Sequence, residues 1–144
     1  MVQKWCIVGT IILVGILHVP AVFYNWYFFL WWYDVMMHML GGVAMGLLGS
    51  GILRMILGKK VHLTPWALGF LYVGFVLGFV ALIGIGWEWL EGIVDAVLLP
   101  QLHMGNAQLG LVDTLLDLYF DLMGGVLGLC ISAILFLKPL FLKR

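Results

Sequence analysis

Four long apolar runs divide this chain and predict four membrane-spanning helices. They cover about residues 5–24, 33–57, 66–99 and 112–137. Each run can cross a hydrocarbon core about 30 Å thick, because that distance needs about 20 helical residues. The third run is long for one crossing, so we expect it to tilt, to break near Gly84 and Gly86, or to extend beyond the bilayer. The pattern predicts an all-α fold, an antiparallel four-helix bundle that forms a single transmembrane domain over residues 1–144.

Short polar or aromatic segments separate the apolar runs. Residues 25–33 are rich in Trp and Tyr, which favour the membrane–water boundary, and we interpret most Trp and Tyr residues as anchors there. The segment therefore predicts a turn or short interfacial helix between the first two spans. The first run resembles a signal peptide in length, but no small-x-small cleavage site follows it, so we interpret it as a span. We detect no sequence repeat.

Charged residues are sorted by sign along the predicted bundle. With four spans, every basic residue falls on one side, and every acidic residue lies toward the other. The basic residues are Lys4, Arg54, Lys59, Lys60, Lys138, Lys143 and Arg144; the acidic residues are Asp34, Glu88, Glu91, Asp95, Asp113, Asp117 and Asp121. The positive-inside rule then predicts that both termini are cytoplasmic. As a separate expectation, the membrane is a bacterial or archaeal cytoplasmic membrane.

Composition supports this interpretation and excludes others. Hydrophobic residues make up 65% of the chain and charged residues 10%, whereas a soluble domain is about one quarter charged. A chain with no basic surplus and no polar tract is not expected to bind nucleic acid. Cys6 and Cys130 both lie in apolar runs, so no disulfide framework is expected.

Three of the predicted helices each carry one narrow face that is acidic toward the outside and small toward the inside. These faces comprise Asp34, His38, Gly42, Gly46 and Ser50; then Glu88, Glu91 and Asp95 with Ala81, Gly78 and Gly74; then Asp113, Asp117, Asp121, Gly124 and Gly128. Small residues let membrane helices approach closely. A carboxylate that faces lipid costs a few kcal/mol, so we expect the acidic side chains to converge inside the bundle or to line a wet cavity.

The converging carboxylates need a counter-charge, and the outer half of the predicted bundle contains no Lys or Arg. They must be protonated, be solvated or bind cations. Carboxylates combined with imidazole suit Mn, Fe or Zn, so we predict one or two divalent ions. The predicted ligands are His38, Glu88, Glu91, Asp117 and Asp121, with Asp34 and Asp113 as catalytic bases or outer ligands.

Simpler interpretations of single residues stay open. Asp34 and Asp113 can be N-terminal helix caps, and His38 can be a hydrogen-bonded core histidine. His18 can bond to a backbone carbonyl freed by the nearby Pro20. His103 lies in the second outer loop and is either an ordinary loop residue or a further ligand.

The order of these motifs resembles the YjdF-like and VanZ-like families of small bacterial membrane proteins. The resemblance covers about residues 34–128 and depends on three patterns, Asp34-x-x-x-His38, Glu88-x-x-Glu91 and Asp113-x-x-x-Asp117-x-x-x-Asp121. VanZ-like proteins commonly have Lys where this chain has Val35 and Asn where it has Asp121, so the chain is nearer to the YjdF-like side. VanZ-like members are associated with glycopeptide (teicoplanin) resistance. The resemblance implies positions for a site rather than a reaction.

Three classes of function are compatible with these patterns. The first is a metal-dependent membrane enzyme open to the extracytoplasmic side, such as a hydrolase acting on a lipid or lipid-linked phosphate. A di-iron oxidase ranks lower because His is scarce. The second is a proton or divalent-cation transport or relay protein. The third is an accessory subunit of a larger membrane complex, and association into an oligomer is compatible with all three.

Overall fold

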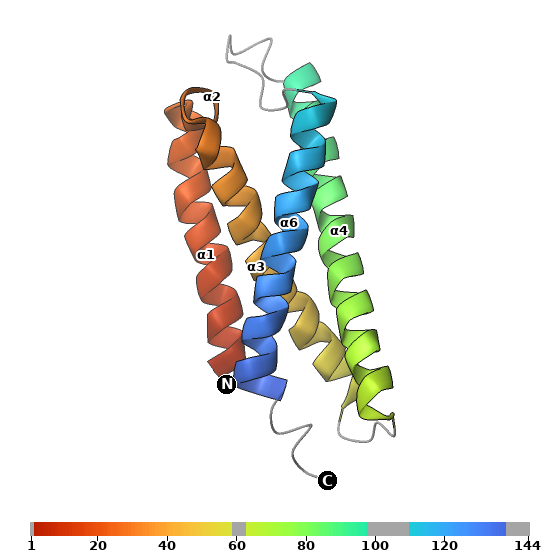
Figure 1. Ribbon diagram of the computed structural model, residues 1–144. Coiled ribbons are helices and arrows are strands. Elements are labelled where there is room, and N and C mark those ends of the chain that lie inside the picture. The colour runs from red at the N-terminus through yellow and green to blue at the C-terminus, as the bar shows by residue number, and fades with distance from the viewer. Residues whose placement is uncertain (1, 59–62, 98–109, 138–144) are drawn as a thin grey trace.

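The computed structural model describes residues 2–58, 63–97 and 110–137, and these are helical with no strand. The long helices are α1 (Val2–Phe23), α3 (Trp31–Leu57), α4 (Pro65–Val97) and α6 (Leu111–Ser132) (Figure 1). A short helix α2 (Trp26–Phe29) joins α1 to α3, and a π-helical turn η1 (Ala133–Leu137) follows α6. In the described part of the chain, four helices are long and apolar enough to cross a membrane. His103 and five of the basic residues lie outside the described ranges.

The long helices run alternately up and down, so that α1 begins and α6 ends at the same end of the bundle (Figure 1). Lys4 and Arg54 belong to this end, since Lys4 lies at the start of α1 and Arg54 in the last turn of α3. Helix α4 continues unbroken through Gly84 and Gly86. Its length at 1.5 Å per residue is about 50 Å, so it tilts or extends beyond the hydrocarbon core instead of breaking.

The aromatic segment between α1 and α3 folds back onto both helices. Asn25 has a φ of 54°, a left-handed conformation that Asn adopts more readily than most residues, and it turns the chain into α2. Helix α3 begins at Trp31, so the end of this segment already forms its first turn. The buried Tyr33 packs with Ala21 and Met37, and its hydroxyl donates to the Leu17 carbonyl at 2.9 Å. This small core holds α1 against α3.

The closest helix contact in the bundle joins α3 to α6, which run parallel. A Cβ added to Gly42 would collide with the backbone of Asp121, and one added to Gly46 would meet the Gly125 carbonyl oxygen at 2.7 Å. Gly128 lies similarly close to the backbone of α3. Glycines spaced in this way let two membrane helices cross with their backbones in contact. The predicted small faces of the second and fourth spans are therefore confirmed as the packing surface.

Parallel packing also reveals a short pattern that α3 and α6 share. Both contain Asp-x-x-x-(His/Asp)-x-x-Gly-Gly-Val, at residues 34–43 and 117–126. Asp34 is thus equivalent to Asp117, and His38 to Asp121. The chain therefore contains a short repeat, contrary to the expectation from the sequence. The repeat is confined to one helix in each half of the chain.

The face predicted for the third span was wrong in its inner half. Gly74 and Gly78 are both exposed, and added Cβ atoms there would meet nothing within 4 Å. The buried face of α4 instead consists of residues four apart: Tyr72, Val76, Val80, Gly84 and Glu88. A face that recurs every four residues winds around the helix, as expected where helices cross at an angle. The predicted face assumed the seven-residue spacing of nearly aligned helices.

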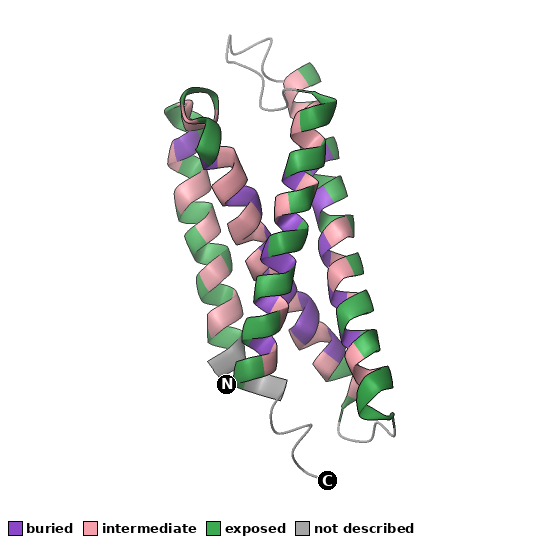
Figure 2. Ribbon diagram, in the orientation of Figure 1, coloured by how far each residue is buried: buried purple, intermediate pink, exposed green. Residues whose placement is uncertain are grey.

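Buried positions gather where α3 contacts α6 and α4, whereas α1 is mostly exposed or half-buried (Figure 2). Helix α1 packs mainly on α3 and has few contacts with α4 or α6. The bundle is therefore a tight three-helix core with a fourth helix attached along one side.

Two adjacent glycines of α3 provide a test of the backbone contact. We expect Gly42→Ala to lower the free energy of unfolding by about 1–3 kcal/mol, because the new Cβ overpacks against Asp121. Gly41→Ala is the control, since nothing lies within 4 Å of its Cβ, and removing a helical Gly should stabilise by up to about 1 kcal/mol. Thermal unfolding in detergent, followed by tryptophan fluorescence, measures both. Equal effects would contradict the close contact.

Candidate metal centre

His38 lies at the centre of four carboxylates contributed by three helices. Its Nε2 atom is 3.6 Å from Asp34 Oδ1, 3.9 Å from Glu88 Oε1 and 3.9 Å from Asp117 Oδ1. Its Nδ1 atom is 3.4 Å from Asp121 Oδ1 on the opposite edge of the ring. Four of these residues are almost fully buried, with exposed fractions of 5% for His38, 4% for Glu88, 3% for Asp117 and 7% for Asp121.

Helix geometry accounts for this convergence. Residues four apart share a helix face, which places Asp34 over His38 on α3 and Asp117 over Asp121 on α6. The glycine contact then brings these two faces together. On α4, Gly84 leaves room for the Asp121 carboxylate, because a Cβ at Gly84 would collide with its Oδ2 atom. Glu88 lies one turn further along α4 and completes the ring.

Two groups of side chains have the proximity that a metal ion requires. Asp34, His38 and Asp117 form one group, and His38, Glu88 and Glu91 form the other, with ligand atoms within 4.8 Å of one another in each. Asp121 joins the cluster through its contact with the imidazole. Six of the seven predicted site residues are thus brought together.

Asp113, the seventh predicted residue, is half-buried in the first turn of α6 and belongs to neither group. Asp95 is also half-buried and outside both groups. Neither Asp34 nor Asp113 is the N-cap of its helix, since those positions are Leu30 and Gly110.

Aromatic side chains form an outer layer beside the cluster. Trp87 Nε1 donates to Glu91 Oε1 at 2.7 Å, and the Tyr27 hydroxyl lies 2.7 Å from His18 Nδ1. The rings of His18 and Trp87 pack edge to face, with their centroids 5.4 Å apart, and this contact links α1 to α4. His18 therefore bonds to a tyrosine instead of to a carbonyl freed by Pro20.

Tyr27 and Trp87 were not predicted as site residues, because most tyrosines and tryptophans were interpreted as interfacial anchors. For Trp87, the four-residue spacing to Glu91 was a usable signal, since side chains so spaced are neighbours on a helix. For Tyr27 no local signal existed, because its partner His18 lies on another helix.

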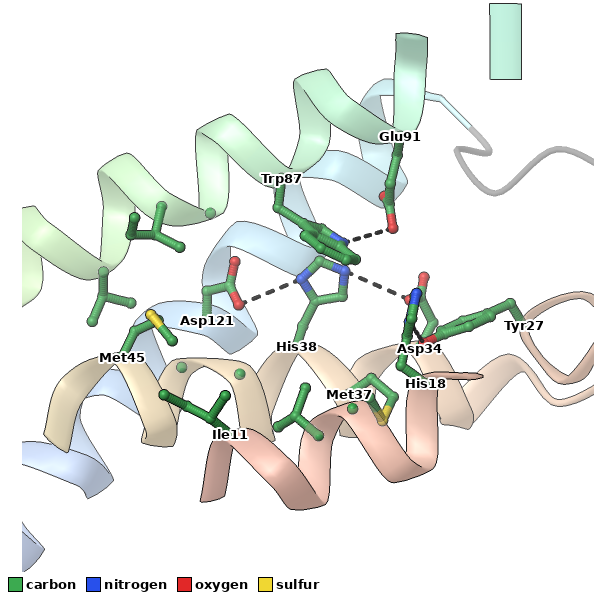
Figure 3. A pocket seen from close by; sticks show the side chains of 17 residues that line it. Ile11, His18, Tyr27, Asp34, Met37, His38, Met45, Trp87, Glu91 and Asp121 are labelled. Atoms are coloured by element: carbon green, nitrogen blue, oxygen red, sulfur yellow. Dashed lines mark hydrogen bonds and ion pairs between the residues drawn. The ribbon is translucent and has the colours of Figure 1, made fainter. Parts of the chain in front are cut away.

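A cavity of about 350 Å³ adjoins the cluster and is lined by all four long helices and Tyr27 (Figure 3). Asp34, His38, Glu91 and Asp121 line it at one end, beside Trp87 and His18. The remainder of the lining is largely apolar and includes Ile11, Met37 and Met45. The charged cluster is thus accessible from a cavity and is not sealed within a packed core.

No basic side chain of this chain lies near the cluster in sequence. The chain contains no Lys or Arg between residues 5 and 53 or between residues 61 and 137. His38 supplies at most one positive charge against five carboxylates, those of Asp34, Glu88, Glu91, Asp117 and Asp121. The arrangement can therefore accept cations from outside.

The fold and the site together define the class of this protein. It is an integral membrane protein whose described part has four apolar helices and a cluster of His and carboxylate side chains within the bundle. The chain belongs to the family described as "Predicted membrane protein (DUF2238)", whose model matches residues 3–138. It is also 33% identical over 102 residues to an uncharacterized protein from Thermotoga maritima; the match covers 71% of this chain and 48% of that protein. The chain thus spans about half the length of this relative. No solved structure matches it.

Titration of Tyr27 provides a test of the outer layer. Burial raises the pKa of Tyr27 well above its ordinary value, and the nearby Asp34 carboxylate raises it further. A free tyrosine is half ionised at about pH 10, so the folded protein keeps the Tyr27 proton beyond that pH. The resulting stability is complete below about pH 10 and decreases above it. We expect the phenolate absorbance difference between wild type and Tyr27→Phe to develop only above about pH 10; a half-developed difference at that pH would contradict the buried position.

Proposed function

We propose that this protein is a metal-dependent membrane hydrolase whose centre forms around His38. The observation that carries the proposal is the convergence of one imidazole and carboxylates from α3, α4 and α6 in a region of the chain without Lys or Arg. Helix bundles build metal centres from inward Glu, Asp and His side chains at this spacing. A nitrogen ligand among oxygen ligands suits Mn, Fe or Zn.

The distances favour one ion on the Nε2 side of His38. Ligands about 2 Å from a shared ion lie about 3–4 Å from one another, and Asp34, Glu88 and Asp117 lie 3.6–3.9 Å from Nε2. Both candidate groups contain His38, so they compete for the same imidazole. Glu91 adds a further carboxylate at the cavity side. A second ion would need the remaining oxygens without a nitrogen ligand.

Asp121 has a different role in this proposal from the metal ligand predicted from sequence. Its carboxylate faces Nδ1, the ring nitrogen on the other edge of His38. Metal-binding histidines commonly donate this second N–H group to a carboxylate, which fixes the tautomer and the ring orientation. Asp121 therefore positions His38 for the ion.

Hydrolysis of a phosphate ester is a reaction that suits such a centre. A divalent ion held there would lower the pKa of a bound water and offset the charge of phosphate oxygens, a role for which no Lys or Arg lies near the cluster in sequence. Asp34 is proposed as a ligand or base beside the ion, and Asp113, which belongs to neither ligand group, is proposed only as a more distant base. Asp34 lies in the first turn of α3 and Arg54 in its last turn, so the site is in the half of the bundle away from Lys4 and Arg54, and the positive-inside rule assigns that half to the extracytoplasmic side. A lipid or lipid-linked phosphate reaches this depth from the outer leaflet.

A proton or cation pathway receives less support from the same geometry. Beyond the cluster, the glycines of α3 and α6 bring the two backbones into contact. Further along, the buried Ser50 and Ser132 hydroxyls have no hydrogen-bond partner among the described residues. From the sequence patterns alone, we also propose a relation to YjdF-like and VanZ-like proteins, and a role as an accessory subunit or in an oligomer as the third alternative.

Elemental analysis of the purified protein tests the metal centre directly. We expect wild type, prepared without added metal, to carry about one Mn, Fe or Zn ion per chain. Asp117→Ala and His38→Ala should carry none, because each removes a ligand from the centre. Asp95→Asn is the matched control, since Asp95 lies outside both ligand groups. A wild-type protein that is free of metal and binds none on titration would refute the proposal.

The role of Asp121 predicts a graded effect. We expect Asp121→Asn to weaken metal affinity about 10- to 100-fold, as is typical when the partner of a metal-bound imidazole is removed, whereas Asp117→Ala abolishes binding. Competition with a chelator of known affinity measures both variants. Complete loss of metal in Asp121→Asn would instead make Asp121 a direct ligand.

A further inference from the structure

The cavity beside the metal centre has the chemistry of a site for an amphiphile. Charged and hydrogen-bonding groups gather at one end, where Asp34, His38, Glu91 and Asp121 line it (Figure 3). The other end is walled by Ile11 and Val14 of α1, Met45 of α3 and Val80 and Ile83 of α4. A ligand that fills this space has a polar head and a long apolar part.

The length of the cavity matches one leaflet of a bilayer. Between Asp34 and Met45, which both line it, α3 rises about 16 Å. The hydrocarbon core is about 30 Å thick, so this is roughly half of it. The volume of about 350 Å³ is near the lower limit for small-molecule sites, which suits one hydrocarbon chain and not the body of a two-chain lipid.

The position of α1 gives access from the side. Helix α1 packs mainly on α3 and has few contacts with α4 or α6. The described ring contact between α1 and α4 joins His18 to Trp87, next to the polar end of the cavity. Toward the apolar end, Ile11, Val14 and Ile83 wall the space from α1 and α4. In a membrane, the apolar molecules beside this wall are lipid chains.

Glycines create part of the space. Gly15 and Gly41 both line the cavity, and a Cβ added to either would meet nothing within 4 Å. These two glycines therefore leave a volume that side chains would fill, unlike Gly42 and Gly84, whose positions are fixed by contact with Asp121.

We propose that this cavity binds one hydrocarbon chain of an outer-leaflet lipid, with the lipid's phosphate head at the His38 cluster and its chain running along α3 between α1 and α4. The assignment of the head as a phosphate rests on the proposed function, whereas the binding of the chain does not. The substrate class that follows is a phosphate monoester of a long-chain alcohol, since a single chain fits.

Photo-crosslinking tests this proposal. The probe is dodecyl phosphate with a diazirine at the end of its chain, added to the full-length protein in phosphatidylcholine nanodiscs. Labelled residues are mapped by mass spectrometry. We expect labelling at cavity residues that are not exposed on the outer surface, such as Val14, Met45 and Val80, and saturation by unlabelled dodecyl phosphate. Labelling confined to lipid-facing residues such as Ile12 and Leu82, without saturation, would overturn the proposal.

Two variants that fill the cavity make the test specific. Gly41→Leu and Gly15→Leu place a side chain in the free volume from α3 and from α1, and we expect both to lose the cavity labelling. Gly78→Leu is the matched control, because Gly78 also has open space around its Cβ but lies outside the cavity. Cavity labelling that survives in both filled variants would overturn the proposal.

Metal content measured on the same samples separates the two proposals. Saturable cavity labelling in a protein that binds no metal would refute the metal centre and leave the chain site standing. Bound metal without cavity labelling would refute the chain site alone. We expect Gly41→Leu to keep its metal, since Gly41 belongs to neither ligand group.

Discussion

The backbone contact between α3 and α6 is the constraint on which the site depends. These helices can approach so closely only because Gly42, Gly46, Gly124 and Gly128 carry no side chains. The contact fixes the register of one helix against the other. Since each helix carries its ionisable residues one or two turns from these glycines, the register also fixes the height at which His38 meets Asp117 and Asp121. The same glycine contact therefore determines both how α3 and α6 pack and where their ionisable side chains meet.

The same contact limits how far the polar cluster extends. Toward one end the helices present carboxylates and an imidazole, and toward the other they present glycines in van der Waals contact. Charge is thus confined to one part of the bundle, next to a cavity that continues along α1 and α4 as an apolar space. The polar cluster and the apolar space thus meet within one cavity, which is the arrangement that the proposed lipid site depends on.

Much of the fold follows from the sequence, because apolar length alone predicts a membrane helix. The convergence of the acidic residues was also predictable, since lipid offers a carboxylate no favourable alternative. The inner face of α4 was not, because Val76 and Val80 become buried only when helices cross at an angle that no local pattern encodes. The cavity escaped prediction for a similar reason: Gly15 and Gly41 look like any other packing glycine until the surrounding helices are in place. The pairing of His18 with Tyr27 depends on the turn at Asn25.

A cluster of carboxylates far from any Lys or Arg in its own chain has a thermodynamic consequence. In the proposed metal centre, the cation that balances the carboxylates would come from the adjacent water, so that its binding and the folding of the chain would be linked equilibria. An ion that binds only the native state stabilises it by about 2.7 kcal/mol when its concentration is about 100 times its dissociation constant. With the proposed centre occupied, the stability of this bundle would be a property of the chain together with the ions available on one side of the membrane.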